Sequence, residues 1–125
     1  MSKFVKRDVV RTVPIWTLRF TPGYRWNSRK LLKLVPFLCC HGQTIAVAVQ
    51  ERGIIMDGNN VVRVLRMLQR RSVMVVNTDG CARDEIRFAR LATSTLPFEY
   101  YEGKEAEELD LQFDFTPAEE ACCAA

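Results

Sequence analysis

The sequence predicts an α+β fold in which a four-stranded sheet carries three helices on one face, an open-faced βαββαβα sandwich. Two observations predict it. Strand-like and helix-like segments alternate over residues 13–95, with one hairpin among them. The chain has 125 residues, 48% of them hydrophobic and 26% charged, which suits a single globular core. We therefore expect the second face of the sheet to be left to solvent or to a partner.

The first two elements are predicted over residues 13–20 and 31–38. Residues 13–20 alternate apolar with less apolar side chains and are rich in aromatic rings, which is typical of a strand. A turn follows, and Asn27 or Ser28 is a suitable N-cap for the helix. Pro36 lacks an amide proton and crowds the preceding turn, so we expect this helix to kink or end just before it.

A hairpin, a second helix and a fourth strand are predicted next. β-branched residues alternate over residues 44–50, and residues 51–53 supply a turn into a partner strand at residues 54–56. The apolar positions of residues 61–68 are spaced for one face of a helix. Residues 72–77 form an apolar, β-branched run of strand length.

A third helix completes the predicted domain and ends before Pro97. Asp84 and Glu85 precede its apolar positions, where negative charge favours a helix N-terminus. A ferredoxin-like βαββαβ arrangement is an alternative that accounts for the first six elements and leaves this helix as an addition. The order of elements alone does not separate the two folds.

The charge of the chain divides it into a basic body and an acidic tail. Residues 1–98 hold 17 Lys/Arg against 6 Asp/Glu, whereas residues 99–125 hold 1 against 9. We therefore predict a domain at residues 1–98 and an acidic C-terminal extension at residues 99–125. Within it, residues 108–115 alternate polar and apolar side chains at period two, which predicts an extra strand. This strand would add to the sheet of its own chain, pair with a second copy in a homodimer, or bind a partner.

Several function classes are excluded by what the chain lacks. The five cysteines show no CxxC or CxxH spacing, and no Gly-rich phosphate loop is present. We therefore expect no metal, no cofactor and no enzymatic activity. The charged N-terminus is not followed by an apolar signal core, and no apolar run approaches the ~20 residues of a membrane span. A cytoplasmic protein is expected.

The segment G-Y-R-W-N-S-R-K at residues 23–30 follows a predicted strand and opens a predicted helix. It resembles the G-L-H-x-R-P-A-A stretch of the histidine-containing phosphocarrier protein (HPr) family. The spacing of the later elements follows the HPr order over about residues 13–95. This resemblance implies an HPr-like sandwich and a relation to the phosphoenolpyruvate-dependent sugar phosphotransferase system.

The resemblance also implies a degenerate phosphorylation site at Arg25, Asn27 and Ser28. Arg25 stands where the family has its phosphorylated histidine, and a guanidinium has no free nitrogen lone pair to accept a phosphoryl group. Asn27 replaces the family's arginine and Ser28 its proline. No serine or threonine lies where some relatives carry a regulatory serine. Phosphotransfer through this position is therefore expected to be lost.

Basic residues remain at two places that the HPr family uses to dock protein partners. The predicted anion-binding or partner-binding residues are Arg25, Trp26, Arg29, Lys30, Arg63, Arg66 and Arg70. We expect a noncatalytic regulatory or adaptor protein that binds an acidic protein partner through its first two helices. The alternative is a basic nucleic-acid-binding module, but nucleic acid is expected to be the less favoured partner because no recognition motif accompanies the charge.

Overall fold

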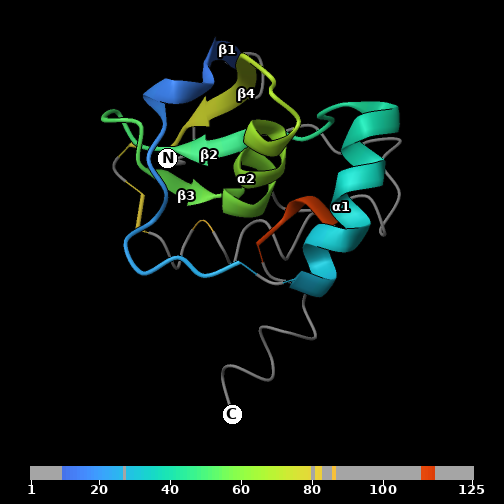
Figure 1. The fold of residues 1–125 in the computed structure, drawn as a ribbon. Helices are drawn as coiled ribbons and strands as arrows, with labels where there is room; N and C mark the ends of the chain where they lie inside the picture. Colours follow the sequence, from blue (N-terminus) through green and yellow to red (C-terminus); the bar gives the residue numbers. More distant parts are fainter. Residues whose placement is uncertain (1–9, 27, 80, 83–85, 87–110, 115–125) are drawn as a thin grey trace.

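The computed structural model describes residues 10–26, 28–79, 81, 82, 86 and 111–114, and these form a mixed four-stranded sheet with two α-helices against it (Figure 1). The elements are β1 (Arg11–Pro14), the 3-10 turn η2 (Ile15–Thr17), α1 (Ser28–His41), β2 (Val47–Val49), β3 (Ile55–Asp57), α2 (Asn59–Met67) and β4 (Ser72–Asn77). A four-stranded sheet and the α+β class are thereby confirmed.

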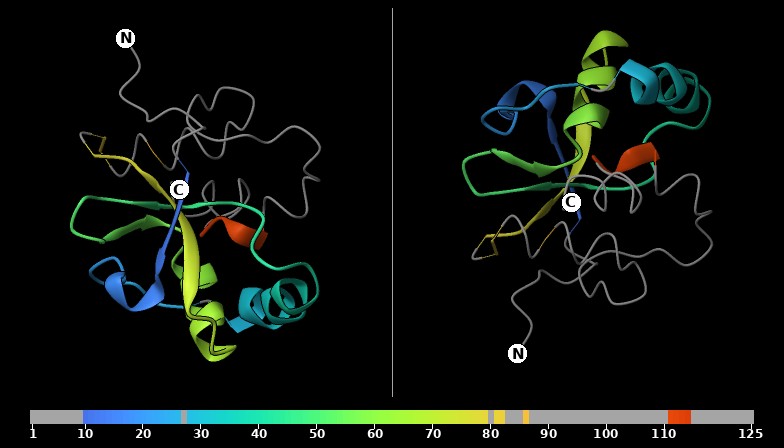
Figure 2. Two further views of the ribbon diagram at one scale, coloured as in Figure 1. Left: turned by 90° about the horizontal axis from the view of Figure 1, so that it is seen from above. Right: turned by 90° about the horizontal axis from the view of Figure 1, so that it is seen from below.

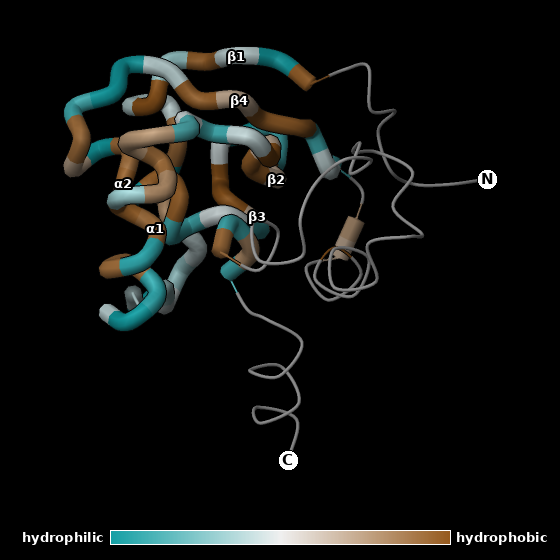
Figure 3. Tube along the Cα trace, turned by 90° about the vertical axis from the view of Figure 1, so that its right-hand side faces the viewer, coloured by the Kyte–Doolittle hydropathy of each residue, from teal (hydrophilic) through white to brown (hydrophobic). Residues whose placement is uncertain are grey.

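The strands lie in the order β1-β4-β2-β3. β1 pairs antiparallel with β4, and β2 pairs antiparallel with β3, as the predicted hairpin requires. The central pair, β2 and β4, is parallel, with Val47 opposite Val75. Because β4 returns to the middle of the sheet after α2, the two short edge strands β1 and β3 flank an apolar centre (Figure 3).

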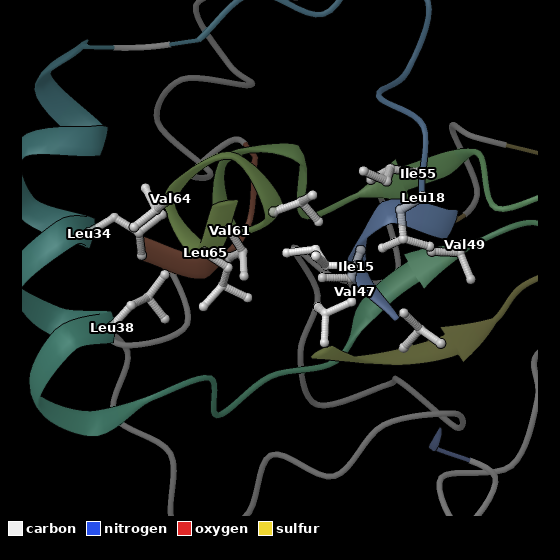
Figure 4. Close-up of a cluster of buried hydrophobic side chains, with 13 residues drawn as sticks. Ile15, Leu18, Leu34, Leu38, Val47, Val49, Ile55, Val61, Val64 and Leu65 are labelled. Atoms are coloured by element: carbon white, nitrogen blue, oxygen red, sulfur yellow. The ribbon is translucent and has the colours of Figure 1, made fainter. Parts of the chain in front are cut away.

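Both helices lie on the same side of the sheet (Figure 2). Leu34 and Leu38 of α1 point toward Val64 and Leu65 of α2 in a fully buried cluster (Figure 4). The sheet contributes alternate residues of β2 and β4 to this cluster, since side chains at every second strand position share a face. The main core therefore lies between the two helices and the sheet.

The second face of the sheet is also buried in the described part of the chain. Ala48 and Val76 are 0% exposed and belong to a separate cluster that includes Cys81 and Ile86. The expectation that this face is left to solvent or to a partner is therefore wrong for these residues. The short side chains of Ala48 and Val76 allow other residues to pack closely on this face. Cys81 and Ile86, in the segment after β4, provide part of this packing.

Three elements differ clearly from their predicted bounds. The first strand ends at Pro14, and residues 15–17 form the turn η2 with Ile15 buried in the core. The first helix runs through Pro36 to His41, so the expected end at the proline is wrong. The strand predicted at residues 44–50 is confined to Val47–Val49. Pro36 is exposed, and its missing amide leaves the carbonyl of Leu32 on the exposed side of α1, where water can satisfy it.

The predicted third helix lies outside the described residues, apart from the buried Ile86, and so does the boundary at residues 98 and 99. Both remain predictions. The predicted C-terminal strand is wrong at residues 111–114, which form a helical turn and a bend. The residues at 112 and 113 are both buried, so the period-two pattern does not continue through this segment. No helix in the part of the chain that the structure describes is long and apolar enough to cross a membrane.

The tight turn of the β2–β3 hairpin requires glycine at position 53. Gly53 has a φ of +80°, and a Cβ there would collide with the carbonyl oxygen of Thr17. We expect Gly53→Ala to lower the free energy of unfolding by ~2 kcal/mol or more, measured by urea unfolding. Gly42→Ala is the matched control, because Gly42 has a φ of +71° but open space around it. Gly42→Ala should lower the free energy of unfolding by about 1 kcal/mol. Equal losses of unfolding free energy for the two variants would show that the collision at Gly53 is relieved.

Candidate functional site

The residues predicted to bind an anion or a partner lie at the start of α1 and along α2, but they are not equally available. Arg25, Ser28 and Arg29 are exposed, and Ser28 is the first residue of α1. Asn27 lies outside the described residues. Lys30 is only 6% exposed, so its side chain is directed into the protein and not onto the predicted surface.

Trp26 and Arg63 form a stacked pair between the loop before α1 and the first turn of α2. The guanidinium carbon of Arg63 lies 3.8 Å from the centroid of the indole ring. Within the described part of the chain, Nε of Arg63 is buried without a hydrogen-bond partner, so the ring contact is what holds this guanidinium. Trp26 remains 51% exposed.

Arg66 lies three residues further along α2, on the same face as Arg63. Its guanidinium carbon is 4.8 Å from the ring centroid of Phe20. Its Nη2 donates to the carbonyl oxygens of Leu18 at 2.7 Å and Ile15 at 3.4 Å. Arg66 therefore ties α2 to η2, the turn that also presents Trp16 at 73% exposure.

Arg70 follows directly after a helix ending that fixes its backbone. Gln69 adopts a left-handed conformation with a φ of +58°. The amide of Gln69 then donates to the carbonyl of Arg66, and the amide of Arg70 to that of Leu65, each at 2.9 to 3.0 Å. These two hydrogen bonds, together with the left-handed conformation of Gln69, form the Schellman motif at the end of a helix, here without glycine. The exposed side chain of Arg70 is thus placed just past the helix end.

Two pairs of contacts, Trp26 with Arg63 and Arg66 with Phe20 and η2, lie on neighbouring elements that also carry the exposed side chains of Trp16 and Arg70, and we call this group the arginine–aromatic stripe. It consists of Trp16, Phe20, Trp26, Arg63, Arg66 and Arg70. The contacts join the loop before α1, the turn η2 and the outer face of α2. The stripe combines cationic groups held in place by aromatic faces with two indole rings that remain open to solvent.

A second cluster of polar residues surrounds the amino end of α2. The N-cap is Gly58, which has no side chain to satisfy the free amides of the first turn. Buried Asn59 instead bonds to distant residues: its Oδ1 accepts from the amide of Thr21 at 2.9 Å, and its Nδ2 donates to the hydroxyl of Thr21 at 2.9 Å and to Asp114 at 2.8 Å. The hydroxyl of Thr21 donates to the carbonyl of Ile55.

Asn60 and Tyr24 extend this cluster toward the stripe. The phenol of Tyr24 donates to Oδ1 of Asn60 at 2.5 Å, and its ring stacks on Phe20 with centroids 5.1 Å apart. Burial, followed by the negative charge of Asp114, raises the pKa of Tyr24 to about 12, while Arg63 acts in the opposite direction. Tyr24 therefore stays protonated and links the two clusters.

The sequence analysis missed this second cluster. It placed the helix on its apolar positions at residues 61–68 and gave Asn59 and Asp114 no role at the amino end of α2. Two adjacent asparagines after a glycine are typical of a turn or a helix cap, so their residue types alone do not indicate burial. Nothing in the local sequence indicates that Asp114, 55 positions from Asn59, supplies the partner.

No protein-family model matches the sequence, and no characterised protein has a significantly similar sequence. Solved structures with a similar fold include two of a pNOB8-like ParB N-domain. Its C2221 form superposes with a TM-score of 0.52 and 18% identity, covering 82% of this chain and 42% of that one. Another structure of a pNOB8-like ParB N-domain gives a TM-score of 0.50 and 14% identity, over 70% of this chain and 33% of that one. The chain thus spans less than half the length of either matched chain, and the similarity concerns the fold.

These neighbours overturn the resemblance to HPr and, with it, the relation to the phosphotransferase system. The order of strands and helices is shared by unrelated α+β folds, and the motif retained Gly23 as its one unchanged position. Gly23 has a φ of +81°, so it is explained by the turn before α1. The interpretation of Arg25, Asn27 and Ser28 as a degenerate phosphorylation site rested on that resemblance and loses its basis.

Asn59 is the residue that holds the amino-end cluster together. We expect Asn59→Ala to lower the free energy of unfolding by ~2 kcal/mol, because buried hydrogen-bonding groups of Thr21 and Asp114 lose their partner. Asn77→Ala is a matched control, since Asn77 is only partly buried and accepts one bond from the exposed Asp79. Chemical denaturation would measure both. Similar losses for the two variants would contradict a central role for Asn59.

Proposed function

We propose that this protein is a nucleic-acid-binding module of the kind used in DNA partitioning, and that the arginine–aromatic stripe is its contact surface. The observation that carries the proposal is the stripe itself. In it Arg63 stacks on the half-exposed Trp26, and Arg66 binds the turn η2, which presents the exposed Trp16. The ParB N-domain fold supports the same class of function.

The chemistry of the stripe suits a polyanion with aromatic bases. Guanidinium groups bind phosphate oxygens through two parallel hydrogen bonds, and those of Arg63 and Arg66 are already oriented by aromatic rings. The open faces of Trp16 and Trp26 can stack on unpaired bases, an interaction that does not depend on base identity. We therefore infer backbone-directed binding with little sequence preference.

The charge of the body supports this assignment. Residues 1–98 hold 17 Lys/Arg and 6 Asp/Glu, a balance that attracts nucleic acid from a distance. The sequence analysis placed nucleic acid below a protein partner because it found no recognition motif. The ParB-like fold does not support that ranking, and it favours the alternative that the sequence analysis named.

A protein partner bound through α1 and α2 is the second candidate. Leu32 on α1 and Met67 on α2 are 76% and 59% exposed, so both helices that this candidate uses offer an apolar side chain to a protein partner. This candidate predicts binding that depends on apolar side chains and changes little with salt. Nucleic-acid binding through the stripe predicts a steep dependence on salt.

Arg70→Ala and Trp16→Ala test the proposal, since both side chains are exposed. We expect the full chain to bind fluorescein-labelled DNA of about 20 nucleotides, with affinity falling steeply as salt rises from about 50 to 200 mM. Arg70→Ala should weaken binding to single strands and duplexes alike and reduce the salt slope by about 1. Trp16→Ala should weaken single-strand binding by about 5-fold or more through lost stacking.

Arg11→Ala is the matched control, because Arg11 is exposed at the end of β1 that lies away from η2. It removes the same charge, and fluorescence anisotropy should show an affinity close to that of the unaltered chain. An equal loss for Arg11→Ala and Arg70→Ala would contradict the stripe as the contact surface. No binding to either form of DNA at low salt would refute the proposed function and favour the protein partner.

A further inference from the structure

The C-terminal segment at residues 111–114 is docked on the body by buried side chains. Phe113 is 2% exposed and packs with Ile45. Gln112 is 1% exposed, and its Oε1 accepts from the amides of Thr44 and Ile45 at 3.3 and 3.2 Å. Its Nε2 donates to the hydroxyl of Thr44 at 2.5 Å. This amide side chain therefore joins the segment to the chain just before β2.

Asp114 ends this segment at the amino end of α2, where it meets Asp57. The backbone amide of Asp114 donates to Oδ1 of Asp57 at 3.1 Å. The carboxyl group of Asp114 accepts from Nδ2 of Asn59 at 2.8 Å and from the amide of Asn60 at 3.3 Å. Two carboxyl groups are thus brought into one cluster, one at the end of β3 and one at the end of the docked segment.

We propose that residues 111–114 form a pH-sensitive latch, which is closed when Asp114 is protonated and loosened when Asp114 and Asp57 are both ionised. The closed state places two acidic side chains together at a site where Asp57 is 3% exposed. Ionising both groups there costs free energy, because like charges repel more strongly away from water. Undocking the segment moves Asp114 into solvent and removes that cost.

The surroundings of Asp114 set the direction of the response. Burial raises the pKa of Asp114 from 3.8 to about 7, and the charge of Asp57 adds to this. Hydrogen bonds from Asn59 and from the amides of Asn60 and Gly58 act in the opposite direction without cancelling it. Tyr24 stays neutral, and the positive charge of Arg63 acts to lower the pKa of Tyr24 without cancelling its rise.

The sign follows from proton binding. Between pH 4 and 7 the docked segment retains a proton on Asp114 that the undocked segment has lost. Docking is therefore favoured by acid, and the part of its free energy that is linked to this proton is fully present below the pKa of the free carboxyl group. That part is lost progressively as the pH rises to about 7, where Asp114 ionises even in the closed state.

NMR spectroscopy of the full, isotope-labelled chain tests the latch directly. The carboxyl carbon of Asp114 should titrate with a midpoint near 7. The amides of Thr44 and Ile45 report docking, because both donate to Gln112. After correction for intrinsic exchange, their protection from hydrogen exchange should fall by about tenfold or more between pH 5.5 and pH 8.5.

Substitutions separate the latch from general loss of stability. Asp114→Asn removes the charge and keeps one of the two acceptor oxygens, so protection should become independent of pH. Asp114→Ala should lower protection at both pH values, and Glu51→Gln, which removes an exposed carboxyl group in the β2–β3 turn, should change nothing. A midpoint for Asp114 near 4, or equal protection at both pH values in the unaltered chain, would overturn the proposal. None of these readouts requires nucleic acid.

Discussion

The direct passage from β3 into α2 through Gly58 is the constraint on which the rest of the structure depends. Gly58 adopts a φ of +105°, and a Cβ at this position would lie 3.1 Å from both methyl groups of Val47. No linker separates the strand from the helix, so the strand fixes the direction of α2 over the sheet. The apolar side of α2 is then buried, while Arg63 and Arg66 turn toward the loop before α1 and toward η2.

Gly58 also leaves the first backbone amides of α2 without a side-chain acceptor at the N-cap position. A serine or aspartate N-cap would satisfy the first free amides with its own side chain, but glycine has none. Asn59 turns away to bond Thr21, and the amide of Asn60 takes its acceptor from Asp114. Asp114, far along the chain, thereby accepts a hydrogen bond that the side chain of a local N-cap residue would otherwise accept. This explains why residues 111–114 are docked at this position.

Local patterns in the sequence predicted the elements whose own side chains decide the structure. β4 has the bounds predicted from its β-branched run, and α2 follows its apolar spacing to within two residues at its start. The patterns failed where a distant contact decides. The expected strand at residues 13–20 breaks after Pro14, because Ile15 bonds to Arg71 and turns into the core. At residues 111–114 an apparent strand pattern is overridden by the bonds of Gln112 to Thr44 and Ile45.

The candidate site shows the same limit. The sequence analysis singled out Trp26, Arg63 and Arg66 from the basic charge and from the docking positions of the HPr family. In the structure the ring of Trp26 contacts Arg63, while about half of its surface stays exposed. Lys30 has the same charge and a neighbouring position, yet it is buried. The periodicity of α1, which buries Leu34 and Leu38, includes position 30 on the same face, so spacing was the better guide to its position than charge.

The stripe and the latch meet at Tyr24. The ring of Tyr24 stacks on Phe20, whose ring also contacts the guanidinium of Arg66. The hydroxyl of Tyr24 donates to Asn60, and the backbone amide of Asn60 donates to Asp114. The charges of Arg63 and Asp114 act on this one phenol in opposite directions. A change in the ionisation or docking of Asp114 therefore alters the electrostatic field more strongly at the Trp26–Arg63 end of the stripe than at the Arg70 end. Because screening limits such effects to about 10 Å at ordinary salt, the two ends of a nine-residue helix respond unequally.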